Sequence, residues 1–349
     1  MTSSLSRWLL ALPVLALPLL ALGQDTPPRL TVPAREVPVP STVSPELQKR
    51  LAAPIPPLTA MPKTPDGWKK LQREADAKAE KVALAAATLL GAKVEPVEIA
   101  GVKCYRVTPR AVAQGKDKHL IVHVHGGAFV FNGGMAATGE AILLAHACKT
   151  PVLSIDYRMP PEHPFPAAPD DVLVVWKAVL KDHDAKAVVM AGTSAGGGLI
   201  MTTMHRCKEN KLAMPAALFL GTPGADLSKT GDSVYVNAEV DHALGRYEGR
   251  IEACVKLYAD GRDLKDPQVS PIYGDLSGWP PTILITGTRD LLLSATVRTH
   301  RKLRAAGVPA ELHVYEGMSH ADYLTAFPAP ESRDSLAEIA AFFERHLKR

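Results

Sequence analysis

The sequence predicts an α/β protein built on a doubly wound, mostly parallel sheet. Two observations carry this prediction. After about residue 100, short β-rich runs alternate with helical stretches, which is typical of strand–helix–strand units. Several runs are apolar almost throughout, as parallel strands buried on both faces must be. The chain of 349 residues is long for one domain but usual for an α/β enzyme with insertions.

Residues 1–23 have the composition of a secretory signal peptide. A basic residue precedes an apolar run at 8–22 that is too short, and too often interrupted by proline, to span a membrane. Ala21 and Gly23 are the small residues that signal peptidase prefers, so we expect cleavage before Gln24. The mature protein is then periplasmic or extracellular, without stable membrane insertion. A short anchor that is not removed is the alternative.

Residues 24–67 form a proline-rich arm, and the main domain is expected at 68–349. The prolines predict neither regular helix nor central strand in the arm, which either lies extended over the domain or is a partly disordered spacer. From Trp68 to about Leu90, apolar residues recur at helical spacing and predict one amphipathic helix.

Strands and helices alternate through most of the domain. The predicted strands are 102–108, 120–125, 151–156, 187–192, 217–222, 282–287 and 311–316. The predicted helices are 137–148, 168–181, 195–210, 295–306 and 332–348. Residues 224–280 interrupt this pattern with loops and one helix near 247–258, so the insertion is expected above the carboxyl edge of the sheet.

Composition argues against a nucleic-acid partner, because the net charge of +4 is small and dispersed. The four cysteines lie far apart without metal-ligand spacing, and neither a metal nor another cofactor is expected. They are Cys104, Cys148, Cys207 and Cys254. Free thiols and one or two disulfides both fit an exported chain of this size, so the pairing stays open.

The segment GTSAGGG at 192–198 joins a predicted strand to a predicted helix. It lacks the Gly-Lys-Ser/Thr ending of a phosphate-binding loop and the glycine spacing of a dinucleotide-binding fold. It fits the pattern G-x-S-x-G, in which Gly192 and Gly196 let the backbone turn sharply and expose Ser194 as a nucleophile.

A serine nucleophile needs a base and a carboxylate that orients the base, with the acid expected before the histidine along the chain. Asp290 follows the predicted strand 282–287, and His320 follows the predicted strand 311–316. Both should therefore reach the edge of the sheet that carries Ser194. The alternatives are that Asp290 only caps the next helix and that His320 is an ordinary turn residue.

The run HVHGGAF at 123–129 ends a predicted strand with small residues whose amides can face a ligand. Gly127 and Ala128, with the amide of Ala195, would supply the oxyanion hole that acyl transfer requires, and Gly126 would shape it. An ordinary tight turn is the alternative.

Five blocks of the sequence resemble the hormone-sensitive-lipase-like branch of the α/β-hydrolases, which contains bacterial serine carboxylesterases. The blocks are HGGAF at 125–129, IDYRMPPEHPFPAAPDD at 155–171, GTSAGGG at 192–198, DPQVSPIYGDLSGWPPTILITGTRD at 266–290 and YEGMSHADY at 315–323. Across residues 100–349 the resemblance implies an eight-stranded hydrolase sheet and the hydrolysis of carboxylic esters without a cofactor. It also implies a small cap formed by the N-terminal helix, residues 68–95, and the 224–280 insertion.

Carried over residue by residue, Ser194 resembles the family nucleophile, Asp290 the triad acid and His320 the base. Two positions depart from the usual pattern. Thr193 stands where many relatives have aspartate, and a subgroup with the motif GTSAG shares this threonine. Leu291 replaces the usual proline after the triad acid.

His125 opens the segment 125–128, which resembles the family's oxyanion segment and would act with Ala195. The block around Tyr157 resembles the family as well, and we expect it to brace the nucleophile loop and not to touch substrate.

The function predicted from these features is an exported serine esterase that acts on small-molecule esters with short-to-medium acyl chains, as a monomer or a homodimer. A lactone hydrolase or a polysaccharide or xenobiotic deacetylase of the same fold is the alternative. A non-catalytic ligand-binding protein on a hydrolase scaffold is a further one.

Overall fold

The structure, a computed structural model, describes residues 30–55, 57–116 and 118–347. The predicted signal peptide, residues 1–23, lies outside the described residues. The chain divides into two compact units, and the first, which ends at Val37, has no helix or strand in its described part. The second unit begins at Pro38 and holds all the elements named below.

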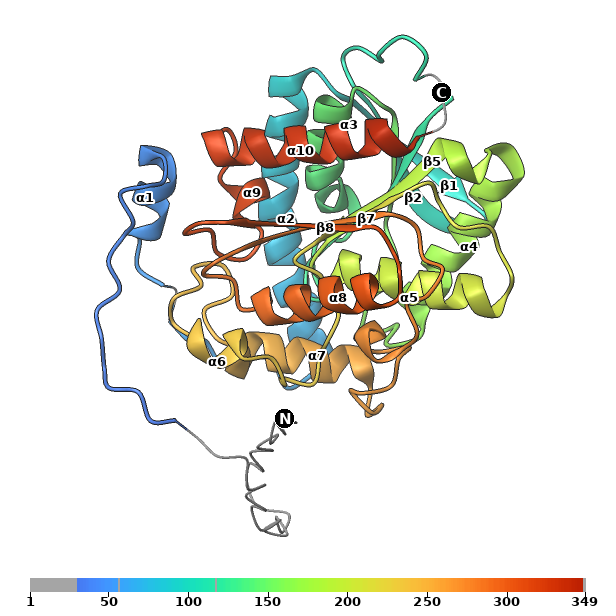
Figure 1. The fold of residues 1–349 in the computed structure, drawn as a ribbon. Helices are drawn as coiled ribbons and strands as arrows, with labels where there is room; N and C mark the ends of the chain where they lie inside the picture. The colour runs from blue at the N-terminus through green and yellow to red at the C-terminus, as the bar shows by residue number, and fades with distance from the viewer. Residues whose placement is uncertain (1–29, 56, 117, 348–349) are drawn as a thin grey trace, which may run out of the picture. The chain divides into compact units, whose positions relative to one another are not determined.

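A mixed eight-stranded sheet forms the centre of the second unit (Figure 1). Its strands are β1 (Lys93–Ile99), β2 (Val102–Thr108), β3 (Leu120–Val124), β4 (Val152–Ile155), β5 (Val188–Thr193), β6 (Leu218–Gly221), β7 (Thr282–Gly287) and β8 (Ala310–Tyr315). The order across the sheet is β1-β2-β4-β3-β5-β6-β7-β8. Strand β2 pairs antiparallel with β1 and β4, and all other neighbours are parallel. The predicted sheet is therefore confirmed, including the eight strands implied by the resemblance.

Helices cover both faces of this sheet, because alternate residues of the central strands supply two separate apolar layers. In β5, Val188 and Met190 belong to one buried cluster, and Val189 and Ala191 to the other. The first cluster includes residues of α4 (Ala167–Asp182), α5 (Ala195–Glu209) and α8 (Leu293–Ala305). The second includes residues of α3 (Gly139–Cys148) and α10 (Pro330–His346), which lie on the opposite side in Figure 1. All five helices begin and end within two residues of their predicted bounds.

Strand β1 is absent from the predicted strands, and the predicted cap segment 68–95 overlaps its first three residues. Its sequence carries charged residues and Pro96, and its side chains are exposed or half-buried. An edge strand tolerates both features because it needs hydrogen bonds on one side only. Among the residues that the structure describes, this strand pairs only with β2.

The prediction that residues 24–67 carry no regular helix is wrong for residues 45–51, which form α1 (Pro45–Leu51), and helix α2 (Pro65–Leu90) also begins inside the arm. In both helices proline occupies the first position, where no intrahelical N–H bond is lost. The Ser44 and Thr64 side chains cap the two helices by accepting backbone N–H bonds.

The insertion 224–280 contains more helix than the one predicted near 247–258. Its elements are α6 (Ser233–Val236), the irregular turn η3 (Tyr247–Ile251), α7 (Glu252–Ala259) and the 3-10 helix η4 (Pro271–Tyr273). The other short elements of the unit are η1 (Gly134–Thr138), η2 (Ala185–Ala187) and α9 (Asp322–Thr325). None of the helices in the described ranges is long and apolar enough to cross a membrane.

The cysteine pairing left open by the sequence is settled, since all four thiols are free and buried. Burial raises the pKa of each thiol to about 12, which keeps the thiols protonated and unreactive near neutral pH.

Candidate active site

Ser194 lies in the turn between β5 and α5, at the carboxyl edge of the sheet. Its backbone has φ 59° and ψ −122°, a conformation that costs an L-residue energy and must be held by its surroundings. Ser194 N donates to Gly221 O over 2.8 Å, and Gly224 N donates to Ser194 O over 2.7 Å. The turn therefore presents a half-buried serine on a backbone fixed from both sides.

Gly192 and Gly196 are required because the end of β3 passes close to this turn. A Cβ on Gly196 would lie 1.9 Å from Val124 O, and a Cβ on Gly192 would lie 2.5 Å from the same atom. Both separations are far shorter than van der Waals contact. The glycine spacing predicted from the sequence thus has a steric cause.

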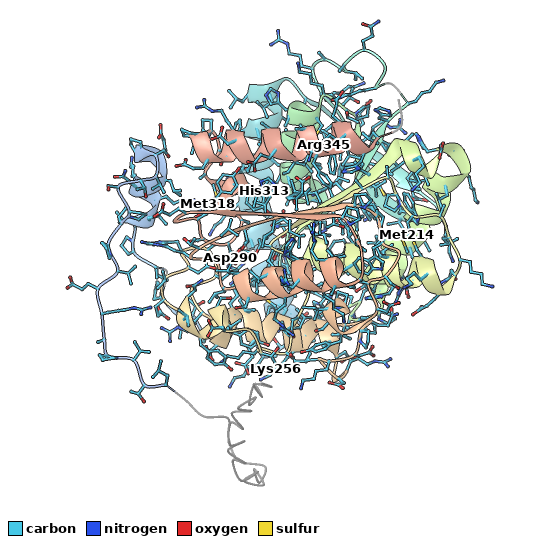
Figure 2. All side chains as sticks on the ribbon, in the orientation of Figure 1. Met214, Lys256, Asp290, His313, Met318 and Arg345 are labelled. Atoms are coloured by element: carbon cyan, nitrogen blue, oxygen red, sulfur yellow. The ribbon has the colours of Figure 1, made fainter. Side chains whose placement is uncertain are left out.

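Asp290 and His320 follow β7 and β8 and lie at the same end of the sheet, where Figure 2 labels Asp290. His320 Nδ1 and Asp290 Oδ1 are 3.1 Å apart, and both side chains are buried. Because a carboxylate accepts, Nδ1 carries the proton and Nε2 is left to accept one. Asp290 Oδ2 also accepts hydrogen bonds from Thr222 Oγ1 and, over 3.0 Å, from Thr286 Oγ1.

Asp290 Oδ1 additionally accepts the N–H of Leu292, over 2.7 Å, just before α8 begins. Leu292 is the N-cap residue of α8 and has no side-chain cap bond, so Asp290 does not cap the helix itself, and its bond to Leu292 N holds the turn before the helix.

Opposing effects set the pKa of His320. Burial lowers this pKa, and the carboxylates of Asp290, Asp241 and Asp322 raise it by more, so that it lies above its usual value of 6.5. The same carboxylates would stabilise the imidazolium that forms when His320 takes up a proton.

Ser194 and His320 line one cavity of about 820 Å³. Among the described residues no hydrogen bond joins Ser194 Oγ to the His320 ring, and such bonds are often long before substrate binds. The structure thus brings the three predicted residues Ser194, Asp290 and His320 to one edge of the sheet, with a direct contact between the last two.

The cavity has an apolar wall and a polar wall, and both predicted cap segments contribute to it. Helix α2 supplies Val82, Ala86 and Leu89 to the apolar wall. The insertion supplies Asp226 to the polar wall, where Arg298 of α8 donates to its carboxylate over 2.5 Å.

The predicted oxyanion residues Gly126, Gly127, Ala128 and Ala195 also line this cavity. The segment is tightly turned, with φ 121° at Gly127 and φ 54° at Ala128, and a Cβ on Gly127 would lie 2.3 Å from Phe131 O. Within the part of the chain that the structure describes, the amides of Gly127, Ala128 and Ala195 donate no hydrogen bond to a protein group. They are available to a ligand, and Ala195 is the first residue of α5, where the helix dipole favours negative charge.

His125 and Tyr157 hold this segment from behind. The His125 ring stacks on Tyr157 with centroids 4.0 Å apart, and Tyr157 Oη donates to His125 O over 2.9 Å. His125 Nδ1 donates to Gly126 O over 2.8 Å, and burial lowers the pKa of His125 to about 3, so the ring is neutral. Tyr157 thus braces the oxyanion segment, whereas the sequence suggested that it braces the nucleophile loop.

Thr193, the departure from aspartate, belongs to a buried polar network behind Ser194. Thr193 Oγ1 donates to Glu140 Oε1 over 2.6 Å, which leaves the Tyr323 hydroxyl, 2.7 Å away, to donate to Thr193. Glu140 Oε2 lies 3.1 Å from His123 Nε2. The threonine therefore links the turn that carries Ser194 to Tyr323, three positions after His320.

Sequence reasoning missed several residues that contact these groups: Thr222, Thr286, Asp241, Glu140 and Tyr323. Thr222 and Thr286 carried a usable signal, because both stand at the carboxyl end of a predicted strand. Tyr323 lies within the family-like block 315–323, although its side chain was given no role there. Glu140 and Asp241 come from helix α3 and from the insertion, where nothing in the local pattern marks them.

The chain is similar to known hydrolases in sequence and in structure. It matches a family model described as the alpha/beta hydrolase fold over residues 121–324. An esterase of Acinetobacter venetianus is 34% identical over 254 residues, which cover 72% of this chain and 81% of that protein.

Two solved structures share the fold. The crystal structure of an esterase named E25 is 49% identical with a TM-score of 0.89, covering 92% of this chain and 99% of that one. A hormone-sensitive lipase from a metagenome library is 29% identical with a TM-score of 0.69, covering 82% of this chain and 100% of that one. The family model spans more than half of the chain, and the observed sheet agrees with it. The chain therefore belongs to the α/β-hydrolase family and, within it, to the hormone-sensitive-lipase-like esterases.

Proposed function

We propose that the protein is a serine carboxylesterase that hydrolyses esters of short-to-medium acyl chains through Ser194, His320 and Asp290. The observation that carries the proposal is the Asp290–His320 contact of 3.1 Å beside the cavity that also holds Ser194. Within the hydrolase family this arrangement supplies a nucleophile, a base and an orienting acid at one place.

In the proposed reaction, Ser194 Oγ attacks the ester carbonyl carbon while His320 Nε2 takes the hydroxyl proton. The oxyanion that forms is stabilised by the free amides of Gly127, Ala128 and Ala195. Collapse of this intermediate breaks the bond to the alcohol, which leaves with the proton from His320. Water then attacks the acyl-serine with His320 again as base, which releases the acid and restores Ser194.

The cavity supports the proposed acyl range. Its volume of about 820 Å³ lies within the usual range for small-molecule sites, and its apolar wall comes from α2. An apolar chain of moderate length can bury its methylene groups there, at about 0.8 kcal/mol for each buried CH₂.

Replacing Ser194 tests the proposal directly. Ser194→Ala should lower the turnover of p-nitrophenyl butyrate roughly a millionfold, because no other group supplies the acyl acceptor. Ser277→Ala is the matched control, since Ser277 is exposed and lies outside the cavity lining, and it should keep full activity. Undiminished hydrolysis by Ser194→Ala would refute the proposal.

The polar wall favours a second candidate, the deacetylation of a hydroxyl-rich substrate. Asp226, Thr230 and Arg298 can exchange hydrogen bonds with hydroxyl groups of an alcohol moiety. A substrate panel of p-nitrophenyl esters, acetylated sugars and lactones separates the candidates. A kcat/KM for acetylated sugars well above that for simple esters would establish the deacetylase.

Export is part of the proposal and is supported by the signal-like composition of residues 1–23. N-terminal sequencing of the exported protein should begin at Gln24, and an intact Met1 would contradict it.

A further inference from the structure

Asp241 is a fully buried carboxylate from the insertion that the proposed mechanism does not use. Its Oδ2 accepts the N–H of Leu291 over 2.9 Å. Its Oδ1 accepts the N–H groups of Ala243 over 2.8 Å and Leu244 over 3.0 Å, with a longer contact of 3.4 Å to the N–H of His320. One side chain thus joins its own turn to the segments that carry the triad acid and the histidine.

The neighbouring residues of the insertion make the same connection. Asn237 Nδ2 donates to Asp290 O over 2.8 Å and to Thr288 O over 3.1 Å. The N–H of His242 donates to Ser319 Oγ over 3.0 Å. Residues 237–242 therefore hold the backbone on both sides of the Asp290–His320 pair.

The departure at Leu291 gives this carboxylate one of its donors. Proline, the usual family residue at this position, has no N–H to donate. Leu291 restores the N–H, and Asp241 supplies the buried acceptor that this N–H requires. Donor and acceptor are two parts of one feature of this chain.

We propose that Asp241 is a positioning residue whose carboxylate fixes the Asp290 and His320 segments relative to each other. The inference rests on the proposed function, in which these two side chains act with Ser194. Asp241 itself is not among the described residues that line the cavity.

The charge of Asp241 also acts on the histidine. Burial and the nearby Asp290 carboxylate raise the pKa of Asp241 above its usual value. Asp241 then joins Asp290 and Asp322 in raising the pKa of His320. Arg50, which donates to the Asp322 carboxylate over 2.5 Å, and His242 also lie beside this cluster. Burial and the cations of Arg289 and Arg50 lower the pKa of His242.

Asp241→Asn is the first test, because the amide keeps the shape and replaces one acceptor oxygen by a donor. Whichever way the amide lies, its NH₂ faces a backbone N–H. We expect kcat for p-nitrophenyl butyrate to fall roughly tenfold to a hundredfold with little change in KM, since the triad shifts and the cavity does not. The matched control is Asp263→Asn, an exposed carboxylate of the same insertion that accepts Lys265 N over 2.9 Å, and it should keep full activity.

Leu291 provides an independent arm. Leu291→Pro removes the N–H and leaves the carboxylate, whereas Leu291→Ala keeps the N–H and removes only the side chain. We expect Leu291→Pro to lower kcat more than Leu291→Ala. In the Asp241→Asn, Leu291→Pro double variant the amide NH₂ no longer faces an N–H, so its kcat should be no lower than that of Asp241→Asn alone. Thermal unfolding of each variant checks that it is folded.

The pH profile separates positioning by a charged group from loosened packing. Loss of the Asp241 charge should lower the pKa of His320, so the acidic limb of kcat/KM should move to lower pH in Asp241→Asn. It should move less in Leu291→Pro, which keeps the carboxylate and removes only one of its N–H donors. Equal activity of Asp241→Asn and Asp263→Asn, multiplied losses in the double variant, or an unmoved limb in Asp241→Asn would each overturn the inference. Failure of the proposed function has a different signature, namely activity that survives Ser194→Ala.

Discussion

At the scale of single residues, the protonation of His320 governs the proposed reaction. The imidazole must be neutral to accept the Ser194 proton, and the surrounding carboxylates of Asp290, Asp241 and Asp322 favour its charged form against the effect of burial. Because the pKa of His320 is raised, more than half of the molecules carry a protonated His320 at pH 6.5. An unperturbed histidine would be half neutral at that pH.

This leads to a pH prediction. The acidic limb of kcat/KM for p-nitrophenyl butyrate should have its midpoint above pH 6.5, because activity is lost as His320 becomes protonated. Asp290→Asn should move that midpoint to lower pH and reduce turnover about ten-thousandfold, since the histidine loses both its charge partner and its tautomer. A midpoint below pH 6.5 in the unmodified enzyme would contradict the assignment.

The order of Ser194, Asp290 and His320 was within reach of sequence reasoning because each follows a strand with a clear apolar pattern. Asp241 and Glu140 were not, because their roles depend on which segments of the chain pack against each other. A buried carboxylate in a loop has the same local sequence signal as an exposed one.

At the scale of elements, the packing of β3 against the turn after β5 sets the geometry of Ser194. The G-x-S-x-G pattern predicted small residues here, but the reason for them is visible only in space, where Val124 O lies against Gly196. In the same way, β1 was missed because an edge strand lacks the apolar run by which buried strands are found. Helices with strong periodicity were predicted almost to their ends.

The close approach of Val124 O in β3 to Gly196 in α5 predicts an unequal response to two glycine substitutions. Gly196→Ala should lower the free energy of unfolding by about 3 kcal/mol, because its Cβ would lie 1.9 Å from Val124 O. Gly139→Ala, at the start of α3 with nothing within 4 Å of its Cβ, should change the same quantity by less than about 1 kcal/mol, in the stabilising direction. Denaturant titration measures both, and similar effects of the two substitutions would contradict the steric explanation.

At the scale of the whole molecule, the parallel order β5-β6-β7-β8 brings three distant parts of the chain to one edge of the sheet. Strand–helix alternation was sufficient to predict that convergence, since the carboxyl ends of parallel strands share an edge. The cavity was not predictable in the same way. Its walls come from α2 and from a loop-rich insertion whose path has no periodic signal.

The central claim is that Ser194 is a nucleophile activated by His320 inside this cavity. Fluorophosphonate labelling of the full chain, with the adduct located by mass spectrometry, measures this most directly. The account predicts one adduct, on Ser194, that forms far more slowly in His320→Ala and is unchanged in Ser277→Ala. An active protein that carries no adduct on Ser194, or labelling that is indifferent to His320, would contradict it.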